Sequence, residues 1–319
     1  YAGMENTTAT IFAQDYVVDE IGFNDRNYVN VNAHELAHQW FGDLITAKSG
    51  KHHWLQEGFA TYYALLAEKE VFGEDYFHHQ LYKTATQLRN AAKTDTIPLM
   101  NEKASSLTFY QKGAWALHVL REAIGEKAFN KAVKKYLKKH KFKNVETDDF
   151  LAEINKVADF DTQNFKEKWL EKSGFEYHEA IGLLTKKNAF IAQYLEIKKQ
   201  KELTNANFVS YLDEYRTILS SDAYYPIKQE IVTQIRNLDY KSNKDLIEIA
   251  LNTNNVFVRR TVAQSLTKVP NYLKTKYESL LNDNSYETRE IAFVNLWNSF
   301  TDSQSKYLEI AKNWLGNND

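Results

Sequence analysis

Two histidines and one glutamate within residues 34–57 constrain this chain more than any other feature. His34 and His38 enclose Glu35 in an HExxH pattern, and Glu57 follows after eighteen further residues. Residues four apart lie about one turn apart on a helix. The spacing therefore predicts a helix that presents both imidazoles from one face.

Two imidazoles and one carboxylate form a typical catalytic zinc site, in which the fourth position is left for water. Magnesium and calcium prefer sites made of oxygen atoms alone. The sequence therefore predicts one Zn²⁺ bound by His34, His38 and Glu57. Glu35 would lie beside the metal, as the general base that takes a proton from the zinc-activated water.

The segment around Glu57 strengthens this interpretation. Residues 54–63 carry apolar side chains at helical spacing around this one acid, which indicates a second helix. A glutamate on such a face is costly unless it is paired or bound to a metal. The alternative is a solvated Glu57 and two ordinary core histidines.

Four motifs then resemble one known family. Residues 34–43 (HELAHQWFGD) and 54–60 (WLQEGFA) resemble the alanyl aminopeptidase and leukotriene-hydrolase family of gluzincins. Residues 3–6 (GMEN) match its GxMEN exopeptidase motif, and residues 110–114 (YQKGA) match its Tyr-x-Lys-Gly segment. The motifs occur in the family's order, and the resemblance covers residues 1–175 in detail.

The resemblance implies a zinc-dependent aminopeptidase that hydrolyses the N-terminal residue from peptides. It implies that Tyr110 is a second catalytic residue, which donates a hydrogen bond to the oxyanion. It also implies that Glu5 binds the free α-ammonium group of the substrate. The remaining substrate-binding residues would be those of the same motif, Gly3, Met4 and Asn6. The alternatives are that Tyr110 is one of twenty ordinary tyrosines and that Glu5 is a surface acid.

Other functions use the same zinc site. An endopeptidase or an epoxide hydrolase is one alternative, and Glu5 argues against the endopeptidase. A degenerate, non-catalytic helical scaffold is another. The presence of all three metal ligands, of Glu35 and of Tyr110 argues against that scaffold.

Secondary partners of the metal site are less distinct in the sequence. Thr61 and Asp43 are candidates to hydrogen-bond the metal-binding histidines. The adjacent pairs His52-His53 and His78-His79 are interpreted as loop or surface residues, because neighbouring side chains do not face one site.

Composition excludes several classes of partner. The 319 residues carry a formal net charge of −2, which favours neither nucleic acid nor an anionic membrane as a partner. No run of eighteen apolar residues occurs, so no membrane span is expected. The absence of cysteine fits a bacterial cytoplasm or periplasm equally well.

The expected partners are peptides with a free N-terminus. In the family, a β-rich N-terminal domain and the first part of the catalytic sheet precede the GxMEN motif. The resemblance therefore implies that the N-terminal part of the same polypeptide is a further partner of this chain.

The expected fold is mostly α. Residues 1–177 are predicted to form a thermolysin-like zinc aminopeptidase domain with an incomplete sheet. Extended structure is expected at residues 1–15, and a helix start at Thr147. Helices are expected at residues 26–42, 54–72, 76–92, 108–124 and 126–141.

Residues 178–319 are predicted to form a HEAT- or armadillo-like helical domain. A repeat of near thirty residues starts at Tyr225, Val256 and Tyr286, and each start follows a polar turn. Such a period is typical of paired helices that stack as a solenoid. The alternative is an irregular helical bundle.

Overall fold

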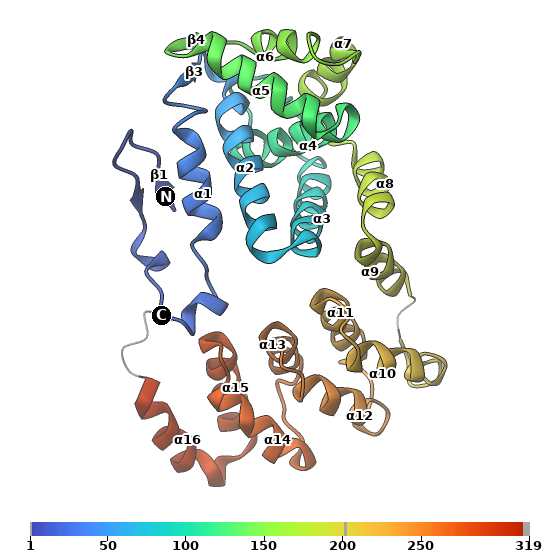
Figure 1. Ribbon diagram of the computed structural model, residues 1–319. Coiled ribbons are helices and arrows are strands. Elements are labelled where there is room, and N and C mark those ends of the chain that lie inside the picture. Colours follow the sequence, from blue (N-terminus) through green and yellow to red (C-terminus); the bar gives the residue numbers. More distant parts are fainter. Residues whose placement is uncertain (1, 201–202, 315–319) are drawn as a thin grey trace. The chain divides into compact units, whose positions relative to one another are not determined.

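The computed structural model describes residues 2–200 and 203–314, and it is mostly helical, as predicted (Figure 1). The chain divides into two compact units. The first contains the residues up to Gln14 and Tyr28–Ile191, and the second contains Asp15–Asn27 and the residues from Ala192 onward. The predicted assignment of residues 1–177 and 178–319 to two named domains stays a prediction.

Strands in the first unit are short and lie in two separate pairs. β1 (Gly3–Met4) pairs antiparallel with β2 (Ile11–Phe12), with Gly3 opposite Phe12. β3 (Ile45–Ala47) pairs parallel with β4 (Lys143–Val145). Of the extended structure expected at residues 1–15, residues 3–12 form a small hairpin, whereas Gln14–Tyr16 is a 3₁₀ helix and Tyr1 lies outside the described residues.

The two helices predicted from the metal motif are present. α1 spans Val29–His38, which is shorter than the predicted 26–42, because the chain turns after Gln39 and the Asp43 N–H returns to the His38 carbonyl. α2 spans Trp54–Phe72, as predicted, and ends at Gly73, whose φ of 93° suits glycine. α2 is apolar on most sides and lies between α1, α3 (Glu74–Ala91) and α4 (Gly113–Ile124) (Figure 1).

The remaining elements of the first unit begin with a π-helix that packs on α2. This π-helix, at Thr108–Lys112, leads into α4, where the sequence predicted one continuous helix over 108–124. The helices that follow are α5 (Glu126–His140), α6 (Thr147–Ile154), α7 (Thr162–Phe165), a second π-helix (Lys166–Glu171) and α8 (Tyr177–Lys187). α6 begins at Thr147, as expected, with a capping box between Glu146 and Asp149.

The core of the first unit is aromatic. Phe59 of α2 is fully buried and stacks on Phe41, with ring centroids 4.2 Å apart. Phe150 meets Phe59 edge-on at 5.1 Å. The centre of α2 therefore cannot shift without disturbing the loop that follows α1 and the helix α6.

The second unit repeats a pair of helices. After α9 (Ala189–Lys199), within which the two units divide, come α10 (Leu212–Ser220), α11 (Tyr225–Ile235), α12 (Tyr240–Leu251), α13 (Val256–Ser265), α14 (Lys274–Glu278), α15 (Tyr286–Ser299) and α16 (Gln304–Ala311). α11 packs on α13 and α13 on α15, while α10 packs on α12 and α12 on α14 (Figure 1). The alternate helices thus form two rows, as stacked helix pairs do.

The predicted repeat positions coincide with helix starts and with the core. α11, α13 and α15 begin at the three predicted repeat starts. The equivalent residues Ile231, Val262 and Ala292 are all fully buried. Asn255 and Ser285, from two of the predicted polar turns, cap the following helices through their side chains. The HEAT-like name stays a prediction, and residues 201–202 and 315–319 of its range lie outside the described residues.

A segment between the hairpin and α1 packs with the second unit. Asp25 forms an ion pair with Arg260 of α13 and accepts a hydrogen bond from the Glu287 N–H at the start of α15 (3.2 Å). Tyr286 donates to Asp19 at 2.6 Å. The second unit thus includes residues that lie between the GMEN motif and the HExxH motif in the sequence.

Among the described residues, no helix combines the length and the apolar composition that a membrane crossing requires.

His118 predicts how the stability of the first unit depends on pH. It lies fully buried on α4, with Nδ1 3.3 Å from the Tyr62 hydroxyl, and burial lowers its pKa to about 3. Below pH 6.5 the unfolded chain takes up this proton before the folded one, so the free energy of unfolding falls as the pH drops from about 6.5 toward 3. The free energy of unfolding of the parent chain should therefore fall between pH 7 and pH 4. For His118→Gln we expect this fall to be smaller by about 3 kcal/mol.

Urea unfolding followed by tryptophan fluorescence at pH 7, 5.5 and 4 measures this difference. The exposed His178→Gln, on α8, is the matched control and should follow the parent chain. Parallel curves for the parent chain and His118→Gln would contradict the prediction.

Candidate active site

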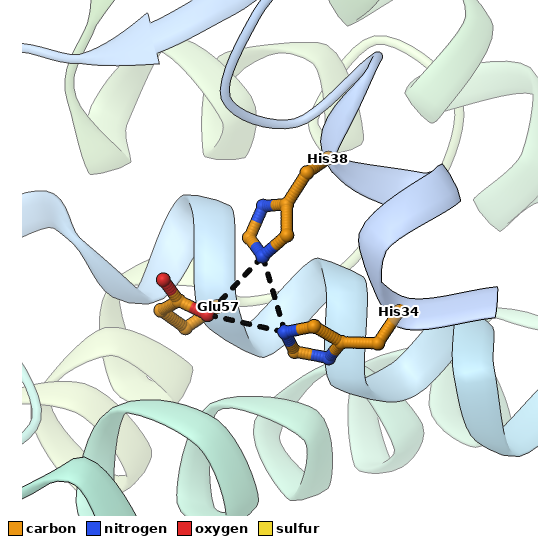
Figure 2. Close-up of side chains that lie close together, drawn as sticks. All are labelled: His34, His38 and Glu57. Atoms are coloured by element: carbon orange, nitrogen blue, oxygen red, sulfur yellow. Dashed lines mark hydrogen bonds and ion pairs between the residues drawn. The ribbon is translucent and has the colours of Figure 1, made fainter. Parts of the chain in front are cut away.

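α1 and α2 bring the three predicted metal ligands together. The Nε2 atoms of His34 and His38 lie 3.1 Å apart. Oε2 of Glu57 lies 3.4 Å from the first nitrogen and 3.3 Å from the second. Figure 2 shows the three side chains pointing toward one another, with the histidines on α1 and the glutamate on α2.

These donors fit a zinc ion. Glu57 is buried, and among the described residues its Oε2 has no hydrogen-bond donor besides the imidazole nitrogens of His34 and His38. The Nδ1–H of His38 donates to the Phe41 carbonyl at 3.0 Å, which fixes the ring and leaves Nε2 directed at the other two donors. A set of two nitrogens and one carboxylate suits zinc better than magnesium or calcium.

The short distances between the imidazoles and the Glu57 carboxylate shift the pKa values of these groups. Burial alone would raise the pKa of Glu57, but the adjacent imidazoles of His34, His38 and His53 outweigh it and hold that pKa far below its ordinary value. Burial alone would lower the pKa of His38, but the Glu57 carboxylate raises it to about 8. A metal ion that binds here must displace this proton.

Glu35 lies beside the hairpin, next to Gly3. Carboxylate oxygens of Glu35 and Glu5 and a ring nitrogen of His38 all lie within 4.8 Å of one another. Glu35 is buried, and burial raises its pKa. The charges of His34 and His38 oppose this rise in pKa, and those of Glu5 and Glu57 add to it. Two carboxylates at this distance repel each other unless a cation or a proton lies between them.

Gly3 allows the hairpin to lie close to the Glu35 carboxylate. A Cβ atom at Gly3 would lie 2.4 Å from Oε1 of Glu35, so a side chain there would displace the Glu35 carboxylate. Of the other predicted substrate-binding residues, Met4 and Asn6 are exposed and Glu5 is half-buried. The Asn6 carbonyl accepts a hydrogen bond from Ala9 (2.9 Å) in the turn between β1 and β2.

Tyr110 joins the site from a π-helix. Its ring stacks on His34, with centroids 5.4 Å apart and planes 6° apart. Burial raises the pKa of the Tyr110 hydroxyl, and the nearby Glu57 carboxylate adds to the rise, so the hydroxyl remains a proton donor at neutral pH. π-helical turns are frequent at functional sites.

Two glycines set the distance between Tyr110 and the metal ligands. A Cβ at Gly58 would lie 2.9 Å from the Cα of Gly113, and a Cβ at Gly113 would lie 2.8 Å from the Cα of Gly58. The residue before Gly58 is Glu57, and Gly113 follows three residues after Tyr110. α2 and the start of α4 can therefore cross in backbone contact only because both positions are glycine.

The sequence interpretation of the other histidines as loop or surface residues was wrong in at least three places. His78 is buried on α3, and its Nδ1 lies 2.8 Å from the Glu74 carbonyl oxygen. His53 places Nε2 3.3 Å from Oε1 of Glu57, because these residues lie one helical turn apart. His52 is buried, and its Nδ1 accepts a hydrogen bond from the Thr147 N–H at 3.1 Å. The spacing of four residues between His53 and Glu57 is the sequence signal for this contact.

The candidates for secondary partners also differ. Phe41, rather than Thr61 or Asp43, holds His38 through its backbone carbonyl. Thr61 Oγ1 and Asp43 Oδ2 are buried and have no hydrogen-bond partner in the part of the chain that the structure describes. A backbone carbonyl leaves no trace in the side-chain pattern, so the sequence could not show it.

Comparisons with known proteins identify the family of the chain. The model of the peptidase family M1 domain matches residues 1–169, and the chain belongs to this family. Aminopeptidase M1-D from Oryza sativa subsp. japonica is 32% identical over 185 residues, which cover 54% of this chain and 21% of that protein. Probable aminopeptidase 1 from Sulfurisphaera tokodaii is 26% identical over 98% of this chain and 44% of its own length. The chain thus spans less than half the length of these two curated relatives.

Solved structures show the same fold over nearly the whole chain. The structure of leukotriene A4 hydrolase from Saccharomyces cerevisiae has a TM-score of 0.52 at 18% identity, covering 98% of this chain and 54% of that one. At this level of identity the likeness concerns the fold alone.

The glycine crossing is testable by stability. Gly113→Ala puts a methyl group against the backbone of α2, so we expect the free energy of unfolding to fall by about 1–3 kcal/mol. Gly182→Ala in α8 is the matched control, because alanine favours a helix and, beyond the adjacent residues and the backbone of α8 itself, no atom of the described residues lies within 4 Å of the added Cβ. Urea unfolding of both variants measures the effect. Equal midpoints for the two variants would show that the crossing tolerates a side chain.

Proposed function

We propose that this chain carries the active site of a zinc aminopeptidase, which hydrolyses the N-terminal residue from peptides. The proposal rests on two clusters of side chains that both contain His38. One is the donor set of His34, His38 and Glu57, and the other contains Glu5 and Glu35. Membership of the peptidase family M1 supports it.

One zinc ion would be held by His34, His38 and Glu57. When bound, zinc supplies a Lewis acid for the scissile carbonyl and lowers the pKa of a water molecule toward about 7. The two helices that carry the donors are fixed by the buried core of the first unit, so the donors lie on rigid elements.

Glu35 would act as the general base. Its carboxylate takes one proton as the water oxygen attacks the peptide carbonyl, and returns it to the leaving nitrogen when the C–N bond breaks. The products are the free amino acid and the shortened peptide, so protons and atoms balance. The raised pKa of Glu35 suits this shuttle, because a base works best when its pKa approaches the working pH.

Glu5 would select substrates with a free N-terminus. Its carboxylate lies next to that of Glu35, and an α-ammonium group would relieve the repulsion between the two acids. An N-blocked peptide offers no charge here and would leave Glu5 desolvated without a partner. The β1 backbone of Gly3 and Met4, with Asn6 in the following turn, would align the first residues of the peptide.

Tyr110 would stabilise the oxyanion. Its hydroxyl stays protonated, and its stacking on His34 keeps it beside the metal donors. A hydrogen bond that forms only as the carbonyl oxygen becomes negative lowers the barrier without tightening substrate binding.

The relatives extend well beyond the segment that they share with this chain. We therefore propose that the activity belongs to the full natural polypeptide, in which an N-terminal part completes the substrate cleft. The assays below use that polypeptide.

The first test compares alanine and leucine fluorogenic amides with their N-acetylated forms. We expect turnover of the free-amine substrates alone, and a fall of about 10²–10⁴-fold in kcat for Glu35→Gln, because the general base is lost. Metal analysis should find the same zinc content in the variant and the parent protein.

Each alternative gives its own result in this assay. Turnover of N-acetylated peptides would indicate an endopeptidase, and turnover of a lipid epoxide alone would indicate an epoxide hydrolase. No turnover of any substrate would favour a non-catalytic scaffold. Activity that survives in Glu35→Gln would remove this residue from the mechanism.

A second test measures how much Tyr110 contributes to stabilisation of the oxyanion. For Tyr110→Phe we expect kcat to fall by about 10²–10³-fold with KM nearly unchanged, because one donor to the developing charge is lost while the ring still stacks on His34. Steady-state kinetics on the leucine substrate separates the two constants. A rise in KM at constant kcat would instead assign Tyr110 to substrate binding.

A further inference from the structure

Gln39 connects the metal-binding helix to the hairpin that carries Glu5. It directly follows His38, the last residue of α1. Its Nε2 donates a hydrogen bond to the Glu5 carbonyl at 3.1 Å, and its Oε1 accepts one from the Thr8 N–H at 3.3 Å. Both ends of one side-chain amide thus bind the backbone of the same turn.

This turn needs such support. β1 and β2 pair over two residues each, and an isolated hairpin of that size is marginal in water. Thr8 adopts a positive φ of 63°, which a β-branched residue adopts only under constraint. Most of the turn is exposed, so packing contributes little to its position.

The contact fixes Glu5 relative to the groups with which it would act. Gln39 belongs to the same segment as Glu35 and His38, and the held carbonyl belongs to Glu5 itself. The Glu5 carboxylate lies within 4.8 Å of the Glu35 carboxylate and of a His38 ring nitrogen. A small rotation of the turn would change that distance, since the side chain of Glu5 extends from this one backbone position.

We propose that Gln39 is a positioning residue for amine recognition, whose amide clamps the turn at residues 5–8 and so aims the Glu5 carboxylate at the substrate's ammonium group. The proposal rests on the proposed aminopeptidase function. The chemistry requires an amide, because a carboxylate cannot donate to the Glu5 carbonyl and an ammonium cannot accept from the Thr8 N–H.

The test uses the full natural polypeptide with zinc bound. Gln39→Met keeps the length of the side chain and removes both hydrogen bonds. We expect KM for the free-amine leucine substrate to rise about tenfold or more, with a smaller change in kcat and unchanged zinc content. Hydrogen exchange of the Thr8 amide should become faster, since its acceptor is lost.

Two further variants sharpen the result. Gln39→Glu keeps an acceptor for Thr8 and loses the donor to Glu5, so Thr8 should stay protected while KM still rises. Gln87→Met makes the same change at an exposed position of α3 and should alter neither quantity.

The outcomes separate this proposal from the function on which it rests. A parent protein that hydrolyses the leucine substrate, beside a Gln39→Met variant with unchanged KM, overturns the role of Gln39 and leaves the aminopeptidase standing. Faster exchange at Thr8 with unchanged KM reduces the clamp to a structural contact and also overturns the proposal. A parent protein without activity removes the proposed function, and the assigned role of Gln39 with it.

Discussion

The buried carboxylate of Glu57 is the constraint around which the first unit is arranged. A charge inside a core is costly unless other charges or a metal compensate it. Here three imidazoles, those of His34, His38 and His53, surround it, from α1 and from the turn before α2. This arrangement requires α1 and α2 to pack against each other. The aromatic core around Phe59 holds the two helices in place.

Glycine residues allow the other parts of the site to come close to Glu57 and its neighbours. Gly58 and Gly113 let α2 and the start of α4 touch, which brings Tyr110 onto His34. Gly3 lets the hairpin lie on Glu35. In both places a glycine sits within a few residues of a functional side chain, because the reach of that side chain is short and the backbone itself must come close.

Local periodicity explains what the sequence could predict. The four-residue spacing of His34 and His38, the bounds of α2 and the starts of α11, α13 and α15 all follow from patterns within one helix or one repeat. The contacts that it could not predict join distant segments. They include the glycine crossing and the packing of Asp25 on Arg260, 235 residues later. The Phe41 carbonyl behind His38 is a local contact, but it belongs to the backbone and leaves no trace in the side-chain pattern. Side-chain spacing within one helix carries no information on contacts between distant segments. The contact of His53 with Glu57 is different, because their four-residue spacing does indicate it.

α1, which carries the proposed metal ligands His34 and His38, is held at both of its ends by side-chain amides. Near its start, Asn30 donates to Oε2 of the buried Glu68 on α2 at 2.7 Å, and Tyr76 of α3 donates to the other oxygen at 2.8 Å. Directly after its end, Gln39 binds the hairpin. A helix fixed at one end can still rotate about its axis, whereas attachment at both ends to different elements opposes that rotation. His34 and His38 are therefore directed at Glu57 by the polypeptide itself, and a metal ion that binds here loses little free energy to the ordering of its ligands.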